Sequence, residues 1–264
     1  MKQVIKKFDS LGALSSFIAS TPVNGVFKDQ SFLSSRDRGI SFNGSESFEA
    51  ANNMMLQGWA EGAARVRKYM NADVTATAPK RVIYNSVVGF APNVPNYLSG
   101  NPRNMYNQKR VKTPKKVVTV IYDCCVGSGV DTKDLETAAA ALFNVISGLE
   151  SSGVRVELWV TMFNHYGTDK LDMAVKIKSA GQPFNLLKMI YPVVHPSFLR
   201  RHGFAVIERS EINEKEWLNG YGRIVSDRNE KTKACQALRI PSDNVFSYYD
   251  ICGKTEAQIA KMIK

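Results

Sequence analysis

The segment from Val117 to Val160 constrains the fold more than any other part of the chain. It opens with VVTVIY, a run of β-branched and apolar residues that is too short for a helix and predicts a strand buried on both faces. From Asp131 the apolar positions repeat at three- to four-residue steps, which predicts an amphipathic helix ending near Gly153. A second strand, VRVELWV, follows. A strand–helix–strand unit of this kind requires a right-handed crossover and a sheet covered by helices.

The remaining periodicities complete an α/β pattern. They predict helices near residues 9–18, 45–59, 60–69, 184–191, 196–202, 211–217, 232–240 and 254–264. They predict strands near residues 81–88, 204–208 and 245–249, and a strand or helix end near 173–180. We therefore expect a doubly wound, mostly parallel α/β sheet. Its parts are an N-terminal helical region (1–73), a Pro- and Asn-rich arm (74–116) and the α/β core (117–264), unless the whole chain forms one domain.

Positive charge is concentrated in the first half of the chain. The 264 residues contain 35 Lys and Arg against 24 Asp and Glu, a net charge of +11. Residues 1–130 hold 17 basic and 8 acidic side chains, whereas residues 131–264 hold 18 and 16. No acidic residue occurs between Val74 and Tyr122. A basic, acid-free segment is typical of proteins that bind polyanions, and the alternative is a solvated basic surface with no such partner.

The acid-free segment also has the composition of an arm. Prolines at positions 79, 92, 95, 102 and 114 exclude a long helix, so we expect one strand followed by an extended segment crossing the surface. Cations neutralise phosphates and aromatic rings stack on unpaired bases, which predicts a single-stranded nucleic-acid interface. The expected phosphate contacts are Lys80, Arg81, Arg103, Lys109, Arg110, Lys112, Lys115 and Lys116, and the expected stacking residues are Tyr97 and Tyr106.

Catalytic signatures are missing from the sequence. It has no GxxxxGK[ST] loop, no GxSxG elbow and no HExxH pair, and its three histidines are scattered. Asp123 ends the central strand, where open α/β sheets bind ligands, but the same carboxylate can instead cap the amides of residues 126–129. We therefore predict a protein that is not an enzyme and that has no cofactor and no metal.

Two further features bear on the compartment. No run of about 18 apolar residues exists, so a membrane span is not expected. The four cysteines have no zinc-ligand or CxxC spacing, which favours buried thiols in a reducing compartment such as the cytoplasm.

The segment VVTVIYDCCVGSGVDTKDLETAAAALFNVISGLESSGVRVELWV resembles the opening of a von Willebrand factor A (vWA) domain. In that family a strand ends in Asp-x-Ser-x-Ser, a helix follows, and a second strand packs beside the first. Aligning Asp123 with the family aspartate places Cys125 and Gly127 where the two metal-binding serines stand. A thiol and a glycine do not replace hard oxygen ligands for Mg²⁺, so the resemblance implies a vWA-like core without its metal site.

A wider resemblance comes from SFNGSESFEAANNMMLQGW, APNVPNYLSGNPRNM and HPSFLRRHGF, which are similar to segments of phage-encoded proteins with the same core. Size, basicity and α/β character resemble the single-stranded-DNA-binding RNA polymerase cofactor of the schitoviruses. This resemblance implies a transcription regulator in the host cytoplasm that binds exposed DNA strands and recruits the phage RNA polymerase, with homo-oligomerisation left open. Two alternatives do not involve nucleic acid: a vWA-like protein–protein interaction module, and a virion structural protein whose arm threads between subunits.

Overall fold

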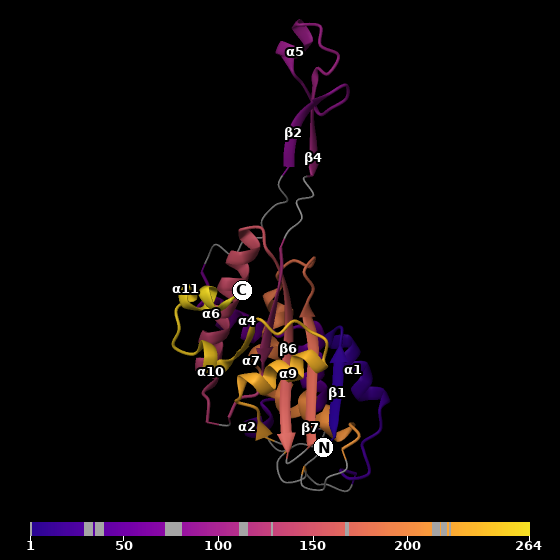
Figure 1. Cartoon of the computed structure of the whole chain (residues 1–264), viewed down its shortest axis with the longest axis vertical. Coiled ribbons are helices and arrows are strands. Elements are labelled where there is room, and N and C mark those ends of the chain that lie inside the picture. Colours follow the sequence, from indigo (N-terminus) through magenta and orange to yellow (C-terminus); the bar gives the residue numbers. More distant parts are fainter. Residues whose placement is uncertain are drawn as a thin grey trace.

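The protein has a central sheet with helices on both faces and an arm that projects from one end (Figure 1). This computed structural model describes residues 2–28, 34, 40–71, 81–110, 116–127, 129–166, 169–212, 217, 221 and 223–264. The predicted fold class is confirmed: an α/β sheet, mostly parallel and Rossmann- or vWA-like, with an N-terminal helical region and an extended arm.

The central sheet has the order β1-β7-β6-β5-β9, with β8 paired to the end of β6. Three neighbouring pairs are parallel (β1 with β7, β5 with β6, β5 with β9), and β6 with β7 forms the antiparallel pair at the centre. The strands are β1 Gln3–Phe8, β5 Val117–Asp123, β6 Arg155–Tyr166, β7 Asp169–Lys178, β8 Arg223–Ile224 and β9 Val245–Ser247.

The predicted β5–α6–β6 unit is confirmed. Helix α6 spans Thr132–Ser151, and the side chain of Asp131 accepts the Lys133 amide hydrogen at 2.9 Å to cap its first turn. The chain leaves the helix through Gly153, whose φ of +97° suits a residue without Cβ. Strands β5 and β6 then run side by side, with Val117 opposite Arg155 and Asp123 opposite Thr161.

Alternate side chains of the strands enter two separate cores. Val118, Val120 and Tyr122 of β5 face the larger core, which most of the helices cover, whereas Ile121 faces a smaller core closed by α9. Figure 1 shows α9 lying across this second face of the sheet. The helices of the body are α1 Leu11–Ser20, α2 Ile40–Asn43, α3 Phe48–Gln57, α4 Ala60–Arg67, α6, α7 Leu186–Val194, α8 Phe204–Glu208, α9 Arg228–Ala237, α10 Tyr248–Ile251 and α11 Glu256–Met262.

The structure corrects several local predictions. Residues 3–8, within the region expected to be helical, form β1 at the edge of the core sheet. Residues 204–208, predicted as a strand, form α8, which continues a π-helix, η1 Phe198–Gly203. The predicted helix at 211–217 is absent at Glu211 and Ile212, and four of its other residues lie outside the described part of the chain.

The π-helix packs closely on the sheet through Gly203. A Cβ added to Gly203 would lie 2.7 Å from Sδ of Met162 on β6, so a larger residue would force the Met162 side chain or the helix to shift. Side chains of α8 are buried nearly all round, including Ala205, Val206 and Ile207. A short apolar run buried on all sides carries no periodicity, which is why FAVIE was assigned to the wrong element.

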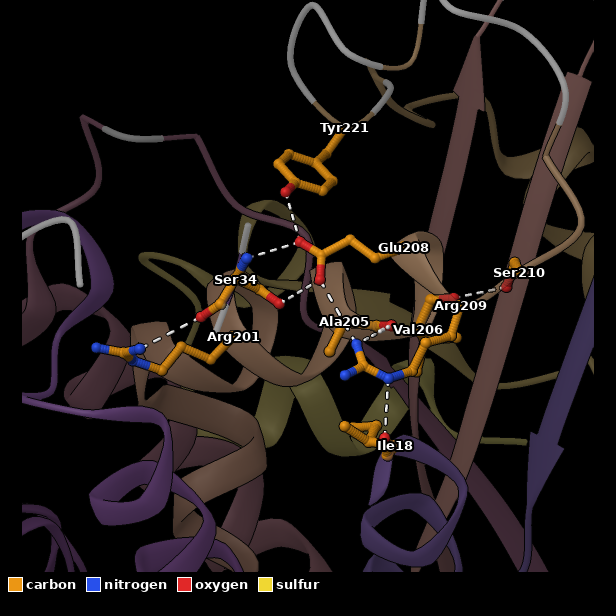
Figure 2. Close-up of polar contacts among 9 residues, drawn as sticks. All are labelled: Ile18, Ser34, Arg201, Ala205, Val206, Glu208, Arg209, Ser210 and Tyr221. Atoms are coloured by element: carbon orange, nitrogen blue, oxygen red, sulfur yellow. Dashed lines mark hydrogen bonds and ion pairs between the residues drawn. The ribbon is translucent and has the colours of Figure 1, made fainter. Parts of the chain in front are cut away.

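A buried carboxylate ties two loops to α8 (Figure 2). Oε1 of Glu208 accepts hydrogen bonds from the Ser34 amide at 2.6 Å and from the Tyr221 hydroxyl at 2.5 Å. Oε2 accepts the Ser34 hydroxyl at 2.7 Å and lies 3.6 Å from Nη1 of Arg209. Burial raises the pKa of Glu208 above its ordinary value even though these donors and Arg209 act in the opposite direction.

Two further findings concern the helices and the cysteines. None of the helices in the described residues is long and apolar enough to cross a membrane. All four cysteines are free: Cys124, Cys125 and Cys235 are buried, as predicted, whereas Cys252 is exposed.

Candidate nucleic-acid interface

The arm, residues 81–110, is a small antiparallel sheet rather than an extended segment crossing the surface. Strand β2 (Arg81–Ser86) pairs with β4 (Met105–Arg110), and β4 pairs on its other side with β3 (Ala91–Pro92). The expected strand at 81–88 is confirmed, and the extended continuation is wrong because the chain folds back on it. Figure 1 shows the arm standing away from the body, with α5 (Val94–Leu98) at its far end.

An asparagine and a glycine shape the far end of the arm. The Asn93 side chain accepts the Asn96 amide hydrogen at 3.3 Å and donates to Oδ1 of Asn85 at 3.0 Å, so it caps α5 and fastens it to β2. Gly89 passes so close to β4 that an added Cβ would lie 2.0 Å from the carbonyl oxygen of Tyr106. These contacts stay within the arm.

The near end of the arm, where β2 and β4 connect to the body, gathers the cations. We call this part the arm stem: Arg81, Lys109 and Arg110. Arg81 is directly opposite Arg110 in the strand register, and exposed Lys109 is opposite Val82. Like charges placed opposite each other destabilise a strand pair, and the arm contains no carboxylate to offset them. The stem therefore places basic residues at partner positions in a part of the chain that has no carboxylate of its own.

The other predicted cations are dispersed. Lys116 is exposed immediately before β5, and its carbonyl oxygen accepts the Arg155 amide hydrogen at 2.9 Å. Arg103 is exposed in the loop between α5 and β4, at the opposite end of the arm from the stem. Lys80, Lys112 and Lys115 lie outside the described residues. The fold thus brings together Arg81, Lys109 and Arg110 and places Arg103 apart from them.

The two predicted stacking residues occupy different parts of the arm. Tyr97 is 67% exposed on α5 at the far end, whereas Tyr106 is half-buried in the middle of the sheet on β4. Tyr84 and Phe90 were not among the predicted stacking residues, yet they are 44% and 62% exposed. Their interleaving with the basic residues was the available signal, and only the folded hairpin shows that their rings face solvent.

The carboxyl end of β5 contains a buried ion pair. Asp123 is fully buried; its Oδ1 accepts the Cys125 amide hydrogen at 3.1 Å and its Oδ2 lies 2.7 Å from Nζ of Lys231. Burial raises the pKa of Asp123, and the nearby ammonium of Lys231 opposes that shift. The Cys125 thiol points into the interior, 3.9 Å from the Phe163 carbonyl oxygen. The cation facing Asp123 is thus a lysine of the protein itself.

A cavity of about 280 Å³ lies beside this strand end, lined in part by Gly127, Asp131, His195 and Arg200. Its two charged side chains already have structural partners: Asp131 caps α6, and Arg200 donates to the Phe42 carbonyl oxygen and stacks over the Phe42 ring. Within the described residues, no three His, Cys, Asp or Glu side chains are arranged to hold a metal ion.

Two of the three histidines belong to a buried aromatic cluster. Nδ1 of His202 lies 3.2 Å from the Tyr191 hydroxyl, and the ring of His195 stacks on Tyr191 at 4.9 Å. Burial lowers the pKa of His202 to about 3 and that of His195 to about 4. Both rings are therefore neutral near pH 7.

Comparison with known proteins yields one match. No curated protein and no solved structure is similar to the chain. A family model described as a domain of unknown function, DUF7192, matches residues 1–263. Since this match covers the vWA-like body and the arm together, the chain belongs to the DUF7192 family.

Proposed function

We propose that the chain is a single-stranded-DNA-binding protein that holds DNA on its arm and catalyses no reaction. One observation carries the proposal: Arg81 and Arg110 are register partners at the near end of an arm that has no carboxylate, and Lys109 precedes Arg110 on the same strand. Such a cluster costs folding free energy while it is unpaired. Phosphates of a bound strand would offset that cost and release counterions.

The exposed aromatic rings favour single strands over duplexes. Tyr84, Phe90 and Tyr97 present their rings to solvent on the same narrow projection as the cations. Each base stacked on such a ring would contribute about 1–3 kcal/mol, and bases are free to stack only when they are unpaired. Tyr106, half-buried on β4, would have a smaller part in this contact.

We extend the proposed DNA binding to a biological role, the recruitment of an RNA polymerase. In our proposal the protein works in the host cytoplasm as a phage transcription cofactor that recruits RNA polymerase to exposed DNA, as the resemblance to the schitovirus cofactor implies. The separation of arm and body supports such a division, since DNA on the arm leaves the vWA-like body free. The free, mostly buried thiols are compatible with a reducing compartment.

The test is a fluorescence-anisotropy titration of the full chain with matched single- and double-stranded oligonucleotides at two salt concentrations. We expect tighter binding to the single strand and a log–log salt slope of about 0.7 per phosphate contact. Replacing Lys109, Arg110 and Lys112 by Glu should abolish this binding. Replacing the exposed body residues Lys133, Lys254 and Lys261 by Glu changes the net charge by the same amount as the stem variant does. This control variant should keep most of the DNA binding. Equal losses in the two variants would contradict the proposal.

A further inference from the structure

The far part of the arm has a chemistry that phosphate binding does not explain. We define the arm tip as residues 82–102, a stretch without a single charged side chain. Its exposed apolar side chains, with exposed fractions from 44% to 78%, are Val82, Ile83, Tyr84, Val87, Val88, Phe90, Val94, Tyr97 and Leu98. Six of these nine are aliphatic and offer no flat ring to a base. An apolar surface of this kind marks a site of contact with another molecule.

The tip also has an open strand edge. In the order β2-β4-β3, strand β2 pairs on one side only, and no other strand of the described residues pairs with its free edge. Proteins protect such edges with prolines, lysines or bulges. Residues 82–86 contain neither proline nor lysine, and the six-residue pairing of β2 with β4 runs without a register shift. The free edge of β2 is therefore ready to pair with an added strand.

We propose that the arm tip docks a protein partner, which adds an extended apolar segment flanked by acidic residues along the free edge of β2. Backbone pairing would give affinity and the exposed Val82, Ile83 and Tyr84 would select apolar side chains. The acidic flanks follow from charge complementarity, because Arg81 at the start of β2 and Arg103 beyond α5 bound the tip and have no acid within the arm.

A second copy of the chain does not fit this surface. Each copy carries a net charge of +11 and the same acid-free arm, so pairing two arms would bring two sets of cations together without carboxylates. This inference extends the recruiting role proposed above by placing a protein-binding site on the tip. The tip shares Tyr84, Phe90 and Tyr97 with the DNA site proposed above, whereas its six exposed aliphatic side chains belong to the protein-binding surface alone.

The experiment is a selection from a displayed library of random 12-residue peptides against the purified full chain, without nucleic acid. We expect enriched peptides that alternate apolar residues and carry Asp or Glu at their ends. Their affinity should fall at least tenfold for Ile83→Lys, because lysine on an edge strand blocks pairing. The control Ile224→Lys alters another exposed apolar side chain, on β8 of the body, and should bind as the parent does.

Several results would overturn the inference. One is enrichment of peptides without acidic residues; another is equal binding by the Ile83→Lys and Ile224→Lys variants. Sedimentation that reveals a dimer lost in Ile83→Lys would identify a second copy as the occupant, and binding to anionic lipid vesicles lost in the same variant would identify a membrane.

A last comparison separates the tip from the DNA site. Replacing Val82 and Ile83 by Ser, which removes no aromatic ring, should abolish peptide binding and lower the affinity for an oligo-dT strand by less than threefold. A loss of DNA binding as large as that of the stem variant would assign the tip to nucleic acid and overturn the inference. If DNA binding fails for the parent chain while peptide binding holds, only the proposed function is wrong.

Discussion

Lys231 on α9 places its ammonium 2.7 Å from Oδ2 of Asp123, the residue that ends the central strand β5. The Asp123 carboxylate is fully buried and the Lys231 side chain is only 9% exposed, so the pair joins α9 to the sheet in an environment with little water. In a vWA domain the matching aspartate is associated with a metal ion. Here an internal lysine supplies the positive charge, and the strand end becomes part of the scaffold.

This pair gives a first prediction. Lys231→Met would leave the Asp123 carboxylate buried without its cation, and we expect the free energy of unfolding to fall by about 3–5 kcal/mol. The double variant Asp123→Asn with Lys231→Met removes both charges and should recover much of that loss. Urea unfolding, monitored by circular dichroism, measures the free energy of unfolding of both variants. A Lys231→Met variant as stable as the parent would show that the ion pair does not stabilise the fold.

A second prediction concerns acid. His202 and His195 have pKa values lowered to about 3 and about 4, whereas both protonate near 6.5 in the unfolded chain. The unfolded state therefore binds more protons below pH 6.5, so stability should fall with decreasing pH by about 1.4 kcal/mol per pH unit for each histidine. His202→Gln should reduce the slope of unfolding free energy against pH by about one proton. An unchanged slope would show that the pKa of His202 is not lowered in the folded protein.

A third prediction concerns the buried carboxylate of Glu208. Tyr221→Phe keeps the ring that stacks on Phe204 at 4.2 Å but removes the hydroxyl that donates to Glu208. We expect a loss of about 1–3 kcal/mol in unfolding free energy. Because burial raises the pKa of Glu208, ionising it costs stability as the pH rises through that value. The Tyr221→Phe deficit should therefore be larger at about pH 8 than at about pH 4, and smaller when Glu208→Gln is also present.

A fourth prediction concerns the independence of the arm. The hydrogen bonds described above for the arm join its residues to one another, and its two strands mainly contact each other. Replacing residues 81–110 by a short Gly-Ser linker should therefore shift the melting temperature of the body by no more than about 2 °C. Calorimetry of the shortened and full chains provides the comparison. A large fall would mean that the body depends on the arm.

A fifth prediction concerns Gly89. Gly89→Ala places a Cβ where only 2.0 Å separates it from the Tyr106 carbonyl oxygen, so β3 and β4 must part. We expect faster amide exchange at Tyr106 and weaker DNA binding, with the melting of the body unchanged. Gly181→Ala is the matched control, because an added Cβ there meets nothing within 4 Å. Equal exchange at Tyr106 in both variants would show that the close approach is not maintained in solution.

The secondary structure of the body could be predicted where the pattern of apolar residues is local and strong. VVTVIY and the apolar repeat of α6 specify a buried strand and an amphipathic helix from neighbouring residues alone, so the central unit was predicted correctly. Strand β1 was missed because its sequence, QVIKKF, is polar and rich in lysine. It is a strand because β7 offers it a pairing edge, which the local sequence cannot reveal.

The arm was predictable in composition but not in shape. The acid-free stretch and its prolines indicated a basic segment extended across the surface, and MYNQKR has no apolar alternation that would mark it as β4. Only pairing with β2 brings Arg110 opposite Arg81, and only the resulting hairpin separates Tyr97 from the stem. The sequence therefore identified the residues of the candidate interface without showing which of them act together.

The pairing of β1 with β7 has a consequence for synthesis of the protein. The Lys2 amide donates to the Asp169 carboxylate across 167 positions of sequence, so β1 is synthesised well before the strand with which it pairs. At roughly 5–20 residues per second, on the order of 10 s pass before β7 has emerged. During that time residues 3–8 have no partner strand, so the edge of the sheet that they form is completed late in synthesis.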